Sequence, residues 1–272
     1  ENDTPALIRH YAQPAQKWAA EALPVGNGRL GAMVFGGVET ERLQLNEDSV
    51  WAGPPVPELT ADFKEAFQRA RKLWFEGQHA EAQMLMQENM PLRISPRSHQ
   101  TLGDLKITLD GVVTDSSIPD DYRRELDLDR AVATTTFTLD GVKHRRQVFA
   151  SVPADVLVMH WTANKPGAIN AIVSLDHSVD ANIKALDEST LSMHGQAGHN
   201  GDDLGVRFQA VLRATSSGGT IKATPDGSLD IDGASSLTLI LGARTDYNRK
   251  SPTVRLKTDL LKAVLNAVTT AA

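Results

Sequence analysis

A long succession of short segments with apolar residues at every second position constrains the fold of this chain more than any other feature. Such alternation is typical of β-strands that bury one face. Turn signals rich in glycine, proline and aspartate separate the segments, as at 165–167 and 225–227. From residue 105 onward we predict strands at 105–109, 122–128, 133–139, 142–149, 156–162, 169–175, 190–194, 206–214, 219–223, 228–231 and 237–241.

The connections between these segments indicate how the strands are arranged. Asp140–Gly141 is the strongest short hairpin signal, because both residues tolerate the positive φ angles of a tight hairpin turn. Residues 7–11 add a first edge strand. Regular alternation of strands with helices is missing, which argues against a doubly wound parallel sheet. We therefore predict an all-β fold, a large antiparallel β-sandwich (supersandwich).

Two helices interrupt the strand pattern at about 60–89. Thr60 is a good N-cap for a helix over 61–76, and Gly77 is suited to its C-terminal end. A second helix is predicted over 79–88. We interpret the aromatic and methionine stripe of this two-helix insertion as core packing; it comprises Phe63, Phe67, Leu73, Trp74, Leu85 and Met86.

The helical period returns after Asp246. Apolar residues from Val254 to Val268 recur at a spacing of about 3.6 residues. Because an isolated short helix is marginal in water, this face must dock on the domain or on a partner outside the sequence. We divide the chain into an N-terminal β-sandwich domain, residues 1–247, and the start of a C-terminal linker helix, residues 248–272.

The stretch from Glu21 to Trp51 combines glycine-rich, acidic and aromatic segments more densely than the rest of the chain. We predict a β-hairpin here, with the glycine-rich segment 26–31 at one end and the acidic and aromatic cluster 46–51 at the other. The adjacent glycines at 36–37 suit a tight turn that needs positive φ. Trp18, just before this stretch, is predicted to pack in the core or beneath the hairpin.

The segment GNGRLG also fits the letters of a dinucleotide-binding fingerprint, with Asp48 about twenty residues downstream. That fingerprint requires a buried parallel strand before the glycines and a helix after them, so that the pyrophosphate meets the helix N-terminus. Pro24 interrupts the approach, and two adjacent glycines make a poor helix interior. The residues therefore argue against nucleotide binding.

Composition and charge exclude several classes of binding partner and site. The 272 residues carry a net charge of −6, which argues against a nucleic-acid or anionic-membrane partner. No apolar run approaches the roughly 20 residues that span a bilayer, and the absence of cysteine removes disulfide and thiol chemistry. One cluster contains residue types that can bind metals, namely His194, His199, Asp202 and Asp203, but its spacing matches no zinc or calcium motif. We therefore predict no cofactor and no metal site.

Pairs of acidic residues are candidates for acid–base hydrolysis, in which one carboxyl group donates a proton and the other activates water. Glu47 and Asp48 are adjacent, so on a strand they would point in opposite directions. Glu125, Asp127 and Asp129 share one strand face, but the arginines around them favour structural ion pairs. The residues alone therefore identify no catalytic pair.

The motifs of this chain resemble those of the glycoside hydrolase family 95 α-L-fucosidases. The similarity follows the chain in order and covers nearly its whole length. The segments that carry it are EALPVGNGRLGAMVFGGVETERLQLNEDSVWAGPP (21–55), RKLWFEGQHAEAQ (71–83), TLGDL (101–105), YRRELDLDRAVATTTF (122–137) and RRQVFASVPADVLV (145–158).

This resemblance implies the N-terminal β-domain of an inverting α-L-fucosidase. In the family, the general-acid glutamate and the aspartate that activates water belong to a downstream (α/α)6 barrel, so no catalytic residue is expected within residues 1–272. The implied partners are that barrel and a fucosylated oligosaccharide or polysaccharide, with a terminal fucose that is α-1,2-linked. The implied location is the periplasm or the exterior of a bacterium, and the lack of cysteine suits a reducing cytosol as well as export.

Arg29, Asn46, Glu47 and Trp51 are the candidate site residues. An aromatic face can stack on a sugar ring, while the polar side chains can bind its hydroxyls. These residues either line the rim of the substrate pocket or lock the interface with the barrel, and the sequence leaves both open. A stand-alone carbohydrate-binding β-sandwich without catalytic activity is the alternative function.

Overall fold

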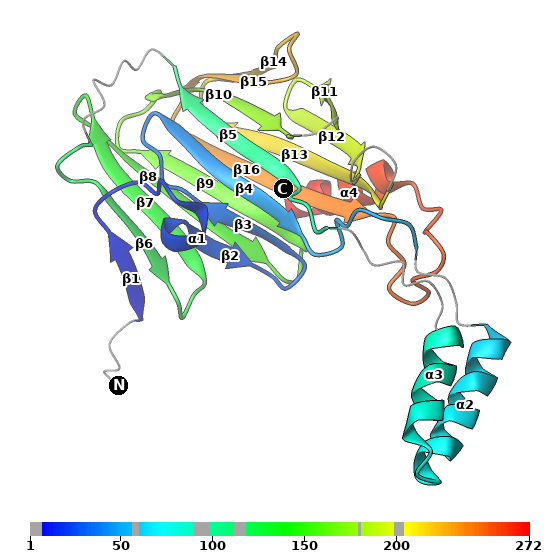
Figure 1. Cartoon of the computed structure of the whole chain (residues 1–272). Helices are drawn as coiled ribbons and strands as arrows, with labels where there is room; N and C mark the ends of the chain where they lie inside the picture. Colours follow the sequence, from blue (N-terminus) through cyan, green and yellow to red (C-terminus); the bar gives the residue numbers. More distant parts are fainter. Residues whose placement is uncertain (1–6, 56–59, 90–97, 111–117, 179–180, 199–203) are drawn as a thin grey trace.

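Two antiparallel β-sheets packed face to face make up most of the molecule (Figure 1). The computed structural model describes residues 7–55, 60–89, 98–110, 118–178, 181–198 and 204–272. The predicted all-β sandwich with a two-helix insertion and a C-terminal helix is confirmed.

The larger sheet has nine strands. In spatial order they are β1 (Ile8–Tyr11), β6 (Arg123–Asp127), β7 (Val132–Leu139), β8 (Val142–Ser151), β9 (Val156–Ala163), β16 (Ser236–Thr245), β13 (Arg207–Ser217), β12 (Thr190–Gln196) and β11 (Ala181–Asp187). The predicted turn between β7 and β8 is confirmed, since Asp140 and Gly141 have φ angles of 49° and 69°. The sequence pattern did not predict β11.

The smaller sheet has seven strands. In spatial order they are β14 (Thr220–Ala223), β15 (Leu229–Ala234), β10 (Ile169–Asp176), β5 (Gly103–Leu109), β4 (Thr40–Glu47), β3 (Leu30–Val34) and β2 (Leu23–Gly26). The predicted hairpin is β3–β4, and Gly36 in its turn has a φ of 75°. Pro24 does not end the strand pattern, because β2 is an edge strand where a missing N–H is tolerated.

One buried arginine joins the two sheets. The guanidinium of Arg146 on β8 lies between two rings, 4.3 Å from the centroid of Trp161 and 4.9 Å from that of Phe137. It donates a 2.6 Å hydrogen bond to the carbonyl of Gly37 and lies 3.8 Å from the carboxylate of Glu41 on β4. Burial raises the pKa of Glu41 and lowers that of Arg146 to about 10. The charged pair is therefore part of the apolar core between the sheets.

The C-terminal helix α4 (Leu260–Ala271) docks on this domain. Asp259 caps it by accepting a 3.0 Å hydrogen bond from the amide of Lys262. Its buried side chains pack on the outer face of the nine-stranded sheet, in a cluster of Val156, Val211, Ile240, Val264 and Val268. The predicted helical face began too early, because Val254 lies outside the helix and is 54% exposed.

The helical insertion consists of α2 (Ala61–Phe75) and α3 (His79–Asn89). The hydroxyl of Thr60 accepts a 3.2 Å hydrogen bond from the amide of Phe63, which confirms the predicted N-cap. Figure 1 shows the pair extending away from both sheets. The prediction that its apolar stripe packs in the core is wrong, because the buried residues are small alanines while Phe67, Trp74 and Phe75 are more than half exposed. None of the described helices is long and apolar enough to cross a bilayer.

The prediction for Trp18 is also wrong. Trp18 begins the short helix α1 (Trp18–Glu21), and its side chain is 54% exposed. Helix α1 lies outside the strands, and a small cluster of Ala15, Ala22 and Phe35 is buried beneath this segment instead. The indole of Trp18 therefore belongs to the surface of the domain.

Candidate functional site

The end of strand β4 sends neighbouring side chains to opposite faces of its sheet. Glu47 points between the two sheets and is 2% exposed, whereas Asn46 points to solvent. This follows from the two-residue period of a strand, which places successive side chains on opposite faces. The four predicted site residues therefore do not form one cluster.

Arg29 and Glu47 meet in a partly buried network. Arg29 lies in the turn between β2 and β3, and its guanidinium lies 3.0 Å from Glu47 and 2.9 Å from Asp155 in the turn between β8 and β9. Arg244 adds a second cation 2.7 Å from Asp155. Burial alone would raise the pKa of Asp155, but hydrogen bonds and charge from Arg29, with the charge of Arg244, bring it below its ordinary value.

Both oxygens of the Glu47 carboxylate accept hydrogen bonds from within the domain. Oε1 accepts from Arg29, while Oε2 accepts 2.8 Å and 2.6 Å hydrogen bonds from the amide and hydroxyl of Ser49. The hydroxyl of Ser49 also lies 2.6 Å from that of Thr245 on β16. Arg29 and Glu47 therefore fasten the β2–β4 segment to the nine-stranded sheet within this domain.

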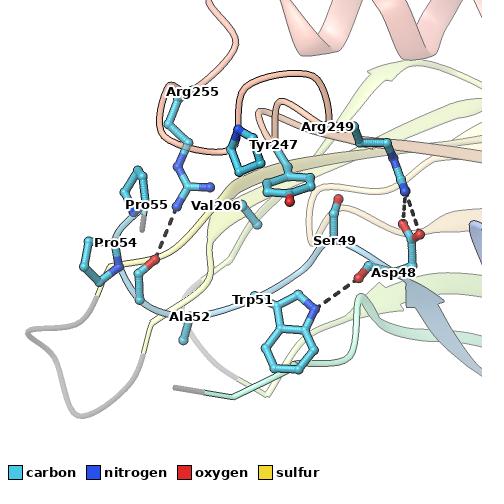
Figure 2. Close-up of a pocket in the computed structure, with 12 residues that line it drawn as sticks. Asp48, Ser49, Trp51, Ala52, Pro54, Pro55, Val206, Tyr247, Arg249 and Arg255 are labelled. Atoms are coloured by element: carbon cyan, nitrogen blue, oxygen red, sulfur yellow. Dashed lines mark hydrogen bonds and ion pairs between the residues drawn. The ribbon is translucent and has the colours of Figure 1, made fainter. Parts of the chain in front are cut away.

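Trp51 lines a pocket beside this network (Figure 2). The pocket has a volume of about 240 Å³ and lies between the loop that follows β4 and the segment that follows β16. The side chain of Trp51 is 42% exposed, and its Nε1 donates a 3.1 Å hydrogen bond to the carbonyl of Asp48. The lining residues are Asp48, Ser49, Trp51, Ala52, Gly53, Pro54, Pro55, Val206, Tyr247, Arg249, Pro252 and Arg255.

The polar wall of the pocket contains one ion pair. Arg249 lies 2.6 Å from Asp48, and hydrogen bonding to that carboxylate raises the pKa of the guanidinium. Arg255 donates a 3.3 Å hydrogen bond to the carbonyl of Gly53. Asp48 is the one carboxylate among the described lining residues, so the pocket lacks the second acid that glycoside hydrolysis requires. Its aromatic and paired polar groups instead suit the binding of a polar ring.

The residues from the segment after β16 were missed by sequence reasoning. Tyr247 and Arg249 meet the β4 loop across about two hundred residues of sequence, as in the pair between Arg249 and Asp48. Neither lies in a motif of known chemistry. Only the antiparallel pairing that brings β16 into the centre of its sheet places them here.

The other sequence candidates have structural surroundings. The glycine-rich segment GNGRLG forms a turn between antiparallel strands, so no helix N-terminus follows it. Glu125 pairs with Arg123 at 2.7 Å, and Asp127 accepts backbone hydrogen bonds in the next turn. In the predicted loop at 193–205, His194 lies on β12, and His199, Asp202 and Asp203 lie outside the described residues. Among the described residues no group of three or more metal-capable side chains is close enough to hold an ion.

Two curated relatives of the chain are named as α-fucosidases. It is 31% identical over 264 residues to Alpha-L-fucosidase 2 of Arabidopsis thaliana, a match that covers 88% of this chain and 30% of the relative. It is 26% identical over 251 residues to Probable alpha-fucosidase A of Aspergillus oryzae, covering 88% of this chain and 33% of that protein. The chain thus spans about a third of the length of these relatives.

A solved structure and a family comparison agree on the domain type. The fold resembles that of a putative kojibiose phosphorylase from human microbiome, with a TM-score of 0.50 and 11% identity over 97% of this chain and 32% of the other. The family described as glycosyl hydrolase family 65, N-terminal domain, matches residues 10–250. The matched range contains every described strand except the first two residues of β1. The chain therefore belongs to this family of N-terminal β-domains, the type found in glycoside hydrolases of families 65 and 95.

Proposed function

We propose that the chain acts as the N-terminal β-domain of an α-L-fucosidase-like glycoside hydrolase that removes terminal, α-1,2-linked L-fucose from oligosaccharides or polysaccharides. Hydrolysis takes place with inversion in a downstream (α/α)6 barrel of the same protein, outside residues 1–272. The names of the relatives, and their greater length, support this division of labour.

The observation that carries the proposal is the composition of the Trp51 pocket. It combines an exposed indole, the phenol of Tyr247 and an arginine–aspartate pair, but only one carboxylate among its described lining residues. Such a site can stack on a pyranose and bind its hydroxyls, yet it cannot supply both an acid and a base. We infer that it contributes to the rim that receives the substrate.

Arg29 and Glu47 take a different role in this proposal. Their partners all lie within the domain, so they hold the β4 loop in place and leave the contact with sugar to Trp51. Asn46 also remains available for sugar contact, because it points outward from β4.

The division of labour is tested by activity of two forms of the protein. Residues 1–272 alone should release no fucose from 2′-fucosyllactose, whereas the longest natural form that contains them should do so. Release by residues 1–272 would refute the assignment of the chemistry to a downstream domain.

The role of Trp51 is tested by Trp51→Ala in the longest natural form. Loss of stacking should raise KM about tenfold, equivalent to about 1.4 kcal/mol, with kcat unchanged, because stacking stabilises bound substrate and transition state alike. Trp74→Ala is the matched control, because Trp74 is similarly exposed on the distant α2. A fall in the unfolding midpoint with unchanged KM would instead assign Trp51 to a domain interface.

The alternative function is a stand-alone carbohydrate-binding module. Two exposed indoles, those of Trp51 and Trp18, support this alternative, whereas the sequence alone offered only Trp51 as an exposed aromatic residue. Saccharide binding by the natural protein, without fucose release by any form of it, would support this alternative.

We also propose export to the periplasm or the cell exterior, where polymeric glycans are found. The family resemblance supports this location. Fractionation of the source cells, with the activity followed in each fraction, tests it.

A further inference from the structure

We propose, resting on the glycan-directed function above, that the outer face of β2, β3 and β4 carries a second saccharide site, walled by Trp18, for a neutral pyranose unit of the fucosylated chain. We call this depression the Trp18 groove. It has a volume of about 350 Å³. The lining residues are Trp18, Pro24, Val25, Gly31, Ala32, Met33, Gln44, Leu45, Asn46, His99 and Thr101.

The chemistry of the Trp18 groove selects a neutral ligand. No aspartate, glutamate, lysine or arginine is among its described lining residues. A charged ligand held there would lose water without gaining a counter-charge, which is costly. A sugar ring has apolar C–H faces and uncharged hydroxyls, so it matches a groove of one indole, aliphatic side chains and polar groups.

The indole of Trp18 is presented by a fixed segment. The carboxylate of Glu21 accepts hydrogen bonds of 2.6 Å and 3.1 Å from the amides of Gln16 and Lys17, which closes the turn that contains α1. Buried Arg124 on β6 donates a 2.6 Å hydrogen bond to the carbonyl of Glu21 and so ties the turn to the nine-stranded sheet. Because the backbone that carries Trp18 is already ordered, binding a ligand costs little further backbone freedom.

Two amide side chains provide the directional contacts. Gln44 and Asn46 both point outward from β4, about 7 Å apart by the repeat of a strand. Neither side chain makes a hydrogen bond to another described residue. Each carries a donor and an acceptor, so the pair can hold two hydroxyls of one ring.

The Trp18 groove and the Trp51 pocket share one wall. The ring of His99 lines the groove, and it meets the ring of Trp51 edge-on with centroids 5.2 Å apart. The Nε2 atom of His99 lies 3.3 Å from the carbonyl of Glu47, and its backbone forms a bridge with that of Trp51. Because the Trp51–His99 contact links the two sites, they can bind successive units of one saccharide chain that crosses it.

The direct test is calorimetric titration of residues 1–272 with the neutral trisaccharide 2′-fucosyllactose. Both sheets and their common core lie within this chain. We expect a Kd on the order of 1 mM, and Trp18→Ala and Asn46→Ala should each weaken binding at least about fivefold. Trp74→Ala is the control and should leave the Kd unchanged. Absence of binding by the unmodified chain, or equal binding by all variants, overturns the proposal.

A kinetic test separates this site from hydrolysis. In the longest natural form, Trp18→Ala should lower the ratio of kcat/KM for 2′-fucosyllactose to kcat/KM for 4-nitrophenyl α-L-fucoside about fivefold, since only the trisaccharide extends beyond its fucose unit. If neither compound is hydrolysed, the proposed activity fails, and the titration still decides the groove. An unchanged ratio, with a lower unfolding midpoint confined to the longer form, would make Trp18 a domain-interface residue and overturn the proposal.

Discussion

Replacement of Arg146 by methionine tests how a buried charge is accommodated between the two sheets. Arg146→Met keeps the unbranched stem but removes the hydrogen bonds to the carbonyls of Gly37 and Val38 and leaves Glu41 without its cation. Breaking a buried pair by removing one partner costs about 3–5 kcal/mol. The free energy of unfolding at pH 8 should fall by this amount.

The stability that Arg146→Met loses should depend on pH, because the carboxyl group of Glu41 titrates. Burial already raises the pKa of this carboxyl, and Arg146 is the charge that opposes the rise, so the pKa climbs further in Arg146→Met. A group whose pKa is higher in the folded than in the unfolded state stabilises the fold at pH values below its unfolded pKa, which is near 4.3 for glutamate. This stabilisation is lost, by about 1.4 kcal/mol per pH unit, as the pH rises from that value through the folded-state pKa. The penalty should therefore be smaller at pH 5 than at pH 8.

Urea unfolding of Arg146→Met, Glu41→Gln and the double variant at both pH values measures this effect. The double variant removes both charges, so it should be less destabilised at pH 8 than the sum of the single variants by about 1–3 kcal/mol. A penalty that is equal at pH 5 and pH 8, together with strict additivity, would refute the reasoning.

Three further predictions concern other parts of the domain. Asp155→Asn removes an acid whose folded-state pKa is lowered, so the unmodified chain should lose more stability than the variant as pH falls from about 4 to 2 in urea titrations; a constant difference would contradict this. Gly242→Ala places a Cβ 2.9 Å from the side chain of Val268, and the free energy of unfolding should fall by about 1–3 kcal/mol, whereas an unchanged midpoint would show that α4 shifts freely. Thr60→Ala removes the cap of α2 at a cost of about 1 kcal/mol, which hydrogen exchange should detect in α2 amides while the global urea midpoint stays the same.

Much of the fold was predictable because strands and turns leave local patterns. The alternation from residue 105 onward predicted most strands, and Asp140–Gly141 predicted the turn between β7 and β8. The sheet order was not predictable, because β16 pairs with both β9 and β13 through contacts between distant segments. The edge strand β11 was missed because its one-sided burial is weak, with no buried residue along it.

The wrong burial predictions concern apolar residues, because the sequence does not show whether another element packs on them. Periodicity showed that α2 has an apolar face, but burial depends on whether another element packs on that face. Here the helices extend away from the sheets (Figure 1). Trp18 was predicted to lie in the core or beneath the hairpin, but it is 54% exposed in the structure.

The candidate site was predictable in part. The stretch around Trp51 was identified from its composition, but its partners Tyr247 and Arg249 come from a segment that carries no signal of its own. The neighbours Asn46 and Glu47 took different roles because a strand turns them to opposite faces.

The four tryptophans give the domain an optical consequence. Trp161 is fully buried beside Arg146, whereas Trp18, Trp51 and Trp74 are 54%, 42% and 55% exposed, on the groove, the pocket and the helical insertion respectively. Each indole therefore reports on a different region, and chains that retain one of them would separate the emission of each region. Iodide should quench the three surface indoles in the native state and reach Trp161 only when the two sheets come apart.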